Sequence, residues 1–283
     1  MNQYRIATIQ DLSCFGKCSL TVAVPLMSAM GLEVCPIPTA ILSTHTGGFT
    51  GWTFRDLSED IPKIVEHWKK EGLTFDAVST GYLGSISQIG MVSDFFDTFP
   101  GMLRVVDPVM ADHGKLYTGF TLEYAAEMTK LCAKADVIVP NLTEAAFMLN
   151  EPYIATGYDE EYIHALLQRL TALGCRTAVV TGVIYDGAHQ GAVAYDSKTG
   201  EYFEHFNENI DVTFHGTGDI FTSALAGALT LELGMQRALE IAVDYTVDCI
   251  RRTMDDKKNH WYGVKFEESI PFMLKLLDKC KCE

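Results

Sequence analysis

An acid beside two glycines, directly before an apolar run, is the clearest indication of chemistry in this sequence. Gly216, Thr217, Gly218 and Asp219 precede residues 220–233, a small-residue stretch with the length of a helix. The first turn of a helix leaves backbone N–H groups unpaired at the positive end of the helix dipole, where phosphate binds well. Asp219 would lie beside that position and could take a proton from a hydroxyl attacking phosphorus. The stretch therefore predicts a phosphoryl-transfer site, although a loop followed by an acidic helix start would produce the same four residues.

The elements that would position this site alternate along the chain. Such alternation of strands and helices predicts an α/β fold with a parallel sheet and helices on both faces. Ligands then bind at the carboxyl ends of the strands, where Asp11, the His45 loop, Tyr82 and Asp107 are expected. The expected strands are residues 4–10, 35–43, 76–80, 103–106, 137–139 and 177–181, and the expected helices are 19–30, 61–71, 85–99, 121–133, 140–149, 160–173, 220–233, 235–253 and 266–277.

Residues 190–206 change to an alternating pattern around Ser197-Lys198-Thr199-Gly200, which indicates a β-hairpin. We interpret it as a small β excursion beside a nucleotide. The sequence has no internal repeat, low-complexity tract or long linker, so residues 1–283 are expected to form a single domain.

The formal charge of −15 argues against nucleic acid or an anionic membrane as a partner, since both require a basic surface. Neither a signal-peptide pattern nor an uncharged apolar run of about 18 residues is present, so a soluble, cytoplasmic protein is expected. The eight cysteines form no C-x-x-C pair, which argues against a zinc site. Cys14, Cys18, Cys280 and Cys282 have no predicted role.

Five short motifs in a fixed order resemble the ribokinase-like superfamily, and specifically its vitamin B6 kinases. They are Thr44-His45-Thr46-Gly47, Thr80-Gly81-Tyr82-Leu83-Gly84, Asp107-Pro108-Val109-Met110, Asn141-Leu142-Thr143-Glu144 and Gly216-Thr217-Gly218-Asp219. The resemblance implies a three-layer α/β/α sandwich with a mainly parallel central sheet. It also implies ATP-dependent phosphorylation of the 5′-hydroxymethyl group of pyridoxal, pyridoxine or pyridoxamine, with Mg²⁺, an optional monovalent cation such as K⁺, and a homodimer.

The same resemblance assigns roles on the nucleotide side. Asp219 becomes the catalytic base, and Gly216, Thr217 and Gly218 form the phosphate cradle. Asn141 and Glu144 would organise Mg²⁺ and its waters, Asp107 would lie near the ATP phosphates and the metal, and Thr181 would contact the nucleotide. Structural alternatives remain open: Asn141 and Glu144 suit a capping box, Asp107 an Asp-Pro turn, and Thr181 a strand end.

On the acceptor side, Tyr82, His45 and Thr46 match positions that face the pyridine ring in the B6 kinases. An aromatic face with hydroxyl and imidazole groups suits a flat, polar alcohol, whereas His45 could equally be a structural histidine. Asp11 departs from the serine of familiar pyridoxal kinases. Its carboxylate could accept a hydrogen bond from a protonated ring nitrogen or an ammonium group, which leaves the preferred vitamer open.

Other functions remain to be separated from this one. A hydroxymethylpyrimidine kinase shares the fold and chemistry, a sugar kinase fits the His45 and Tyr82 loops less well, and a panel of acceptors in an ATP-consumption assay would distinguish all three. A Rossmann-type oxidoreductase or a non-catalytic nucleotide-binding module lacks support, because neither G-x-G-x-x-G nor G-x-x-x-x-G-K-[ST] is present. Tight ATP binding without ADP production from any vitamer would favour a binding module.

Overall fold

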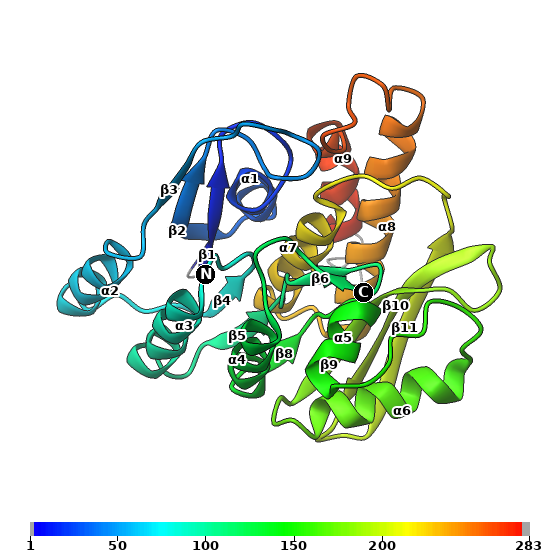
Figure 1. Ribbon diagram of the computed structural model, residues 1–283, viewed down its shortest axis with the longest axis horizontal. Helices are drawn as coiled ribbons and strands as arrows, with labels where there is room; N and C mark the ends of the chain where they lie inside the picture. The colour runs from blue at the N-terminus through cyan, green and yellow to red at the C-terminus, as the bar shows by residue number, and fades with distance from the viewer. Residues whose placement is uncertain (1–2, 279–283) are drawn as a thin grey trace.

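The computed structural model describes residues 3–278 of the 283-residue chain and contains a nine-stranded sheet in the order β11-β10-β9-β8-β5-β4-β1-β2-β3 (Figure 1). Its strands are β1 (Arg5–Ser13), β2 (Glu33–Leu42), β3 (Phe54–Asp56), β4 (Ala77–Thr80), β5 (Leu103–Val106), β8 (Val137–Ile138), β9 (Thr177–Val183), β10 (His189–Asp196) and β11 (Glu201–Glu208). A separate small pair consists of β6 (Ala111–Asp112) and β7 (Lys115–Leu116).

Helices cover both faces of the sheet, as the sequence predicts (Figure 1). They are α1 (Leu20–Ala29), α2 (Ile61–Lys70), α3 (Ile86–Thr98), α4 (Leu122–Ala133), α5 (Leu142–Leu149), α6 (Glu160–Thr171), α7 (Thr217–Thr230), α8 (Met235–Met254) and α9 (Phe266–Asp278). Helices α2 to α6 pack on one face, and α1, α7, α8 and α9 pack on the other.

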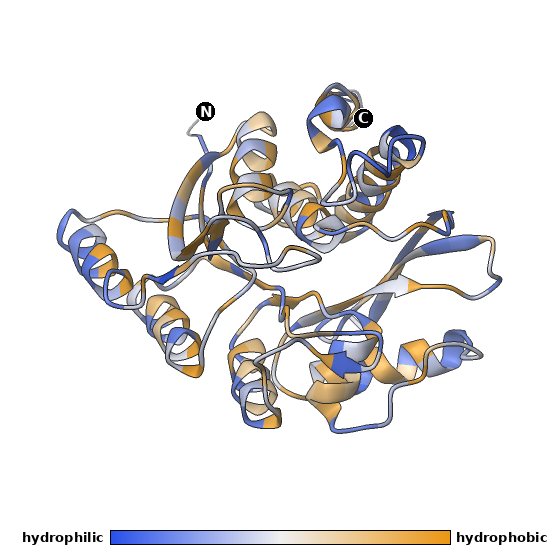
Figure 2. Ribbon diagram, turned by 45° about the horizontal axis from the view of Figure 1, so that its top comes forward, coloured by the Kyte–Doolittle hydropathy of each residue, from blue (hydrophilic) through white to orange (hydrophobic). Residues whose placement is uncertain are grey.

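Alternation along the inner strands supplies two hydrophobic cores. On β1, Ile6 packs in the core beneath α1, α7 and α8, whereas Ala7 packs in the core beneath α3 and α4. Ala77 and Val78 of β4 divide in the same way, because successive side chains of a strand point to opposite faces. Hydrophobic residues accordingly run along the central strands and the helix faces turned toward them (Figure 2).

The predicted α/β architecture with a mainly parallel sheet is confirmed. Strands β1, β2, β4, β5, β8 and β9 are parallel, and the predicted hairpin, β10 with β11, continues the same sheet as an antiparallel edge. None of the helices within residues 3–278 contains a stretch long and apolar enough to cross a bilayer. Cys280 and Cys282 lie outside the described residues.

Two boundaries that matter for the site differ from the prediction. Strand β1 runs to Ser13 rather than ending at residue 10, so Asp11 lies inside the strand, at a register shift against β2. Helix α7 begins at Thr217 rather than residue 220, which places Thr217 and Gly218 in its first turn. The short strands β3, β6 and β7 were not predicted.

Candidate active site

The start of α7 has the geometry of an anion cradle. Gly216 is the N-cap residue with a left-handed φ of 78°, and no side chain caps the helix. A Cβ atom at Gly216 would lie 1.7 Å from the carbonyl oxygen of Lys17, so only glycine lets this turn pack against the loop after β1. At Gly218, by contrast, a Cβ atom would meet nothing within 4 Å. The first turn of α7 therefore borders open space, where its N–H groups can receive a phosphate.

Asp219 lies in that first turn and is turned toward the loop between β1 and α1. Burial, followed by the negative charge of Asp107, raises the pKa of Asp219 to about 8. Hydrogen bonds from the Ser19 backbone N–H and the Cys18 thiol act in the opposite direction. The loop thus holds the carboxylate in place while the surroundings strengthen it as a base.

Asp107 joins the end of β5 to the middle of α7. Its Oδ2 atom accepts a hydrogen bond of 2.6 Å from the Thr222 hydroxyl, and its Oδ1 atom accepts one of 3.3 Å from the Val109 backbone N–H. The side chain is buried, and this burial raises its pKa to about 6. Because Thr222 follows Asp219 by three positions, both residues lie on the same side of α7.

Glu144 forms the capping box that was one interpretation of the Asn141 motif. Its Oε2 atom accepts from the Asn141 backbone N–H at 2.9 Å, and the Asn141 Oδ1 atom accepts from the Glu144 backbone N–H at 2.9 Å. The remaining oxygen, Oε1, accepts from the Met110 backbone N–H at 3.0 Å. Burial and the charge of Asp107 raise the pKa of Glu144 to about 8. The capping interpretation is confirmed, and a role toward metal stays a prediction.

These carboxylates suit Mg²⁺ as a companion of phosphate. Within residues 3–278, Asp107, Glu144 and Asp219 form no ion pair with lysine, arginine or histidine. Nowhere in the described part of the chain are three or more His, Cys, Asp or Glu side chains grouped so that they alone could hold a metal ion. An excess of buried oxygen donors without a complete protein shell fits Mg²⁺, which keeps several waters and binds phosphate oxygens.

On the acceptor side, Asp11 and Tyr82 lie close enough to influence each other. Asp11 is buried, accepts a hydrogen bond of 2.8 Å from the Ser13 hydroxyl, and has a pKa raised by burial. Burial and the charge of Asp11 both raise the pKa of Tyr82. The charge of Asp11 also raises the pKa values of Cys18 and Asp219, so the structure gathers Asp11, Tyr82 and Asp219 at one end of the sheet.

His45 has both ring nitrogens occupied by the protein. Nε2 lies 2.7 Å from the Tyr262 carbonyl oxygen and therefore carries the proton, while Nδ1 accepts from the Gly47 backbone N–H at 3.1 Å. Burial lowers its pKa, which keeps the ring neutral. This arrangement agrees with the structural interpretation of His45, whose ring also packs against Phe49 and His215, with ring centroids 5.0 Å and 5.2 Å away. Thr46 is exposed on the same loop.

Thr181 is drawn to the start of α5 by backbone pairing. It forms an isolated parallel bridge with Asn141, and its N–H donates to the Pro140 carbonyl oxygen at 3.1 Å. Strand β9 continues past it to Val183. Thr181, predicted to contact the nucleotide, and Asn141, predicted to organise Mg²⁺, are therefore neighbours.

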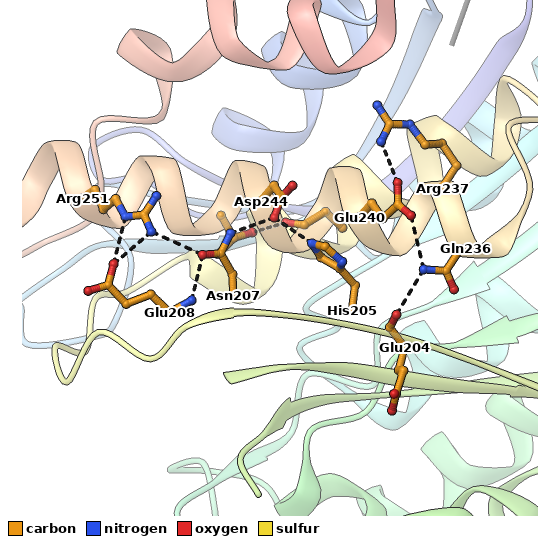
Figure 3. Close-up of polar contacts among 11 residues, drawn as sticks. Glu204, His205, Asn207, Glu208, Gln236, Arg237, Glu240, Asp244 and Arg251 are labelled. Carbon is orange, nitrogen blue, oxygen red and sulfur yellow. Dashed lines mark hydrogen bonds and ion pairs between the residues drawn. The ribbon is translucent and has the colours of Figure 1, made fainter. Parts of the chain in front are cut away.

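Polar contacts fasten α8 across β11, beside the segment that leads to the cradle. Figure 3 shows His205 and Asn207 of the strand turned toward Asp244 of the helix, at 2.8 Å and 2.7 Å from its Oδ1 atom. The hydrogen bond to Asp244 raises the pKa of His205. Nearer the end of β11, Arg251 pairs with Glu208 at 2.9 Å. These contacts fix the strand from which the chain continues to Gly216.

Sequence reasoning missed the groups that hold the predicted acids. Cys18 and Ser19 contact Asp219, and Thr222 contacts Asp107. None of these three residues lies in one of the five motifs. The one signal that could have found Thr222 is its position three residues after Asp219, which places both on the same side of a helix. Thr80, at the end of β4 in the motif of Tyr82, has a buried hydroxyl without a hydrogen-bond partner among residues 3–278.

Comparisons with known proteins agree on one group of kinases. A family model described as phosphomethylpyrimidine kinase matches residues 24–263. A crystal structure of a candidate phosphomethylpyrimidine kinase from Bacteroides thetaiotaomicron, in a form with pyridoxal, is 39% identical, covers 96% of both chains and has a TM-score of 0.90. Pyridoxal kinase from Lactobacillus plantarum is 30% identical over 98% of this chain and 99% of its own, with a TM-score of 0.90. The pyridoxal kinase of Arabidopsis thaliana is 29% identical over 91% of this chain and 85% of its own.

Proposed function

Because the chain belongs to the phosphomethylpyrimidine kinase family, we propose that it transfers the γ-phosphoryl group of ATP to the 5′-hydroxymethyl group of a vitamin B6 vitamer. The observation that carries the proposal is the position of Asp219, a carboxylate with a raised pKa in the first turn of α7, beside the open space at Gly218. Such a group can receive the proton of an attacking hydroxyl while helix N–H groups bind the transferred phosphoryl.

The vitamer is favoured over other alcohols by the relatives and by the side chains around Tyr82. The Bacteroides protein was crystallised with pyridoxal, and the Lactobacillus and Arabidopsis proteins are pyridoxal kinases. In this chain, Tyr82 lies near the acidic Asp11, and its ring is 5.6 Å from that of Phe120, an environment suited to a flat heteroaromatic ring.

Each residue then has a defined task. The N–H groups of Thr217 and Gly218 bind the phosphoryl group, and Asp219 accepts the hydroxyl proton. Asp107 and Glu144 would hold Mg²⁺ through oxygen atoms and water, and the ion would offset the negative charge of the phosphates. Asn141 and Thr181 would border the nucleotide, with K⁺ as an optional activator. A homodimer in the cytoplasm completes the proposal.

The second candidate is a hydroxymethylpyrimidine kinase, which the name of the matching family favours. Both reactions phosphorylate a hydroxymethyl group on a heteroaromatic ring, so Asp219 would serve either.

An acceptor panel tests the proposal. ADP release with Mg-ATP should be measured with pyridoxal, pyridoxine, pyridoxamine, hydroxymethylpyrimidine and ribose. The expected result is the highest kcat/KM with one of the three vitamers. A higher kcat/KM with hydroxymethylpyrimidine would transfer the assignment to the second candidate, and no ADP with any acceptor would overturn both.

A further inference from the structure

We propose that Thr222 is a positioning residue for binding of the Mg-nucleotide, because its hydroxyl fastens the carboxylate of Asp107 to the helix that carries the base. The inference rests on the proposed function for the meaning of the site, but its test measures binding and does not depend on the identity of the acceptor.

The contact joins two distant parts of the chain inside the protein. Thr222 and Asp107 are 115 positions apart in the sequence, are 5% and 8% exposed, and meet at 2.6 Å. A hydroxyl donating to a carboxylate at this distance is a charge-assisted hydrogen bond, which is stronger than a neutral one. The Oδ1 atom of Asp107 accepts a longer hydrogen bond, of 3.3 Å, from the Val109 N–H. The hydrogen bond from Thr222 is therefore the shorter of the two that hold this carboxylate.

The segment after Asp107 connects that restraint to Glu144. Met110, three positions later, donates its backbone N–H to the Oε1 atom of Glu144 at 3.0 Å. Residues 107–110 thus extend from α7 to the start of α5. Asp107 is the first residue of this segment, and Glu144 is hydrogen-bonded to its last residue, Met110. A shift of Asp107 would be passed along this short segment to Glu144, the other carboxylate that is suited to Mg²⁺.

Helix α7 places the base and this restraint together. Asp219 and Thr222 are three positions apart, which is close to one turn, so the orientation of the helix sets the position of both. Loss of the Thr222 hydroxyl would leave a buried carboxylate oxygen without its donor and free the side chain to turn. We expect this loss to affect the nucleotide side, because the Thr222 hydroxyl bonds to Asp107, whereas Asp11 accepts from the Ser13 hydroxyl and the Tyr82 carbonyl oxygen accepts from Thr39.

The test compares Thr222→Val, which keeps the shape of the side chain, with Thr222→Ser, which keeps the hydroxyl. Isothermal titration calorimetry with MgADP, and with ADP in EDTA, gives the two affinities directly. Thr222→Val should weaken MgADP binding about tenfold, the usual effect of losing a hydrogen bond to a charged group. Binding of metal-free ADP and the KM of the vitamer should stay within about twofold, and Thr222→Ser should restore wild-type affinity.

Thr230→Val is the matched control. Thr230 is a buried threonine on the same helix, and its hydroxyl donates to the Ala226 carbonyl oxygen at 2.7 Å, away from any carboxylate. The Thr230→Val substitution should change the melting temperature of the protein without changing its affinity for MgADP. If Thr222→Val does not fold, Thr222→Ala takes its place in the comparison with serine.

Three results would overturn the inference: unchanged MgADP affinity in Thr222→Val, equal losses for Val and Ser, or an equal loss for metal-free ADP. A wild-type protein that binds MgADP normally but phosphorylates none of the acceptors would refute the proposed function and leave this test intact.

Discussion

Replacing Asp219 by Asn should slow the reaction and stabilise the folded protein at the same time. Asn keeps the size of the side chain but can neither accept the hydroxyl proton nor carry a charge. Loss of a positioned base should lower kcat about 100-fold or more. The gain in stability follows from the pKa of Asp219, which burial and the charge of Asp107 raise from 3.8 to about 8.

The sign of the stability effect depends on pH. A carboxyl group whose pKa is raised by folding binds its proton more tightly in the folded protein, so the wild type loses stability as the pH rises from about 4 to about 8. Four pKa units correspond to about 5 kcal/mol at most. Since Asp219 is only partly removed from water, which screens its charge, we expect Asp219→Asn to be more stable by about 2 kcal/mol at pH 8.

Urea unfolding of the ligand-free wild type and variant at pH 5 and pH 8, together with ADP release at pH 7.5, would measure both effects. The difference in free energy of unfolding should be larger at pH 8 than at pH 5. A variant that retains kcat within tenfold of the wild type would contradict the role of base. A difference independent of pH would contradict the burial of a titrating carboxyl group.

Four further substitutions test the surroundings of the base. Gly218→Ala should raise the KM for ATP about tenfold with little change in Tm, because its methyl group would enter the open space at the cradle. Gly216→Ala should instead lower Tm, because its methyl group would meet the Lys17 carbonyl oxygen. Thermal melting and initial rates separate the two effects. Asp11→Ser should alter the order of kcat/KM among pyridoxal, pyridoxine and pyridoxamine, since the carboxylate favours a protonated ring nitrogen or an ammonium group, and an unchanged order would remove that role. His45→Phe keeps a ring but loses the hydrogen bonds of both ring nitrogens. If these bonds stabilise the loop by about 1 kcal/mol, amide hydrogen exchange in residues 257–263 should accelerate about fivefold. Exchange at the wild-type rate would show that the ring, not its nitrogens, holds the loop.

The parts of the site that were predictable from sequence are local. Asp219 and its two glycines are adjacent in the chain, and the spacing of Asn141 and Glu144 is that of a capping box, so both could be read directly. The partners of the acids could not. Thr222 meets Asp107 across 115 positions, and Cys18 reaches Asp219 only because the loop after β1 packs on the start of α7.

Polarity misled the prediction at the end of β1. The strand was predicted to end at residue 10, before the polar Asp11, yet Asp11 and Ser13 are buried and belong to the strand, where they hydrogen-bond to each other. The strands β3, β6 and β7 contain only two or three residues, too few for a periodic pattern. The sequence indicated that His45 could be structural or functional, and only its contacts with Tyr262 and Gly47 show how its nitrogens are used.

The helix that begins at the cradle also fills the interior. Ten of the 14 residues of α7 are buried, and a Cβ atom at Gly227 would come within 2.6 Å of the Met30 sulfur. Substitutions that repack this helix to raise thermal stability would also displace Asp219 in its first turn. Heat resistance and turnover would therefore change together in laboratory evolution. Heat resistance is better sought far from this helix, on α2, where Ile61 is the one buried residue among Ile61–Lys70.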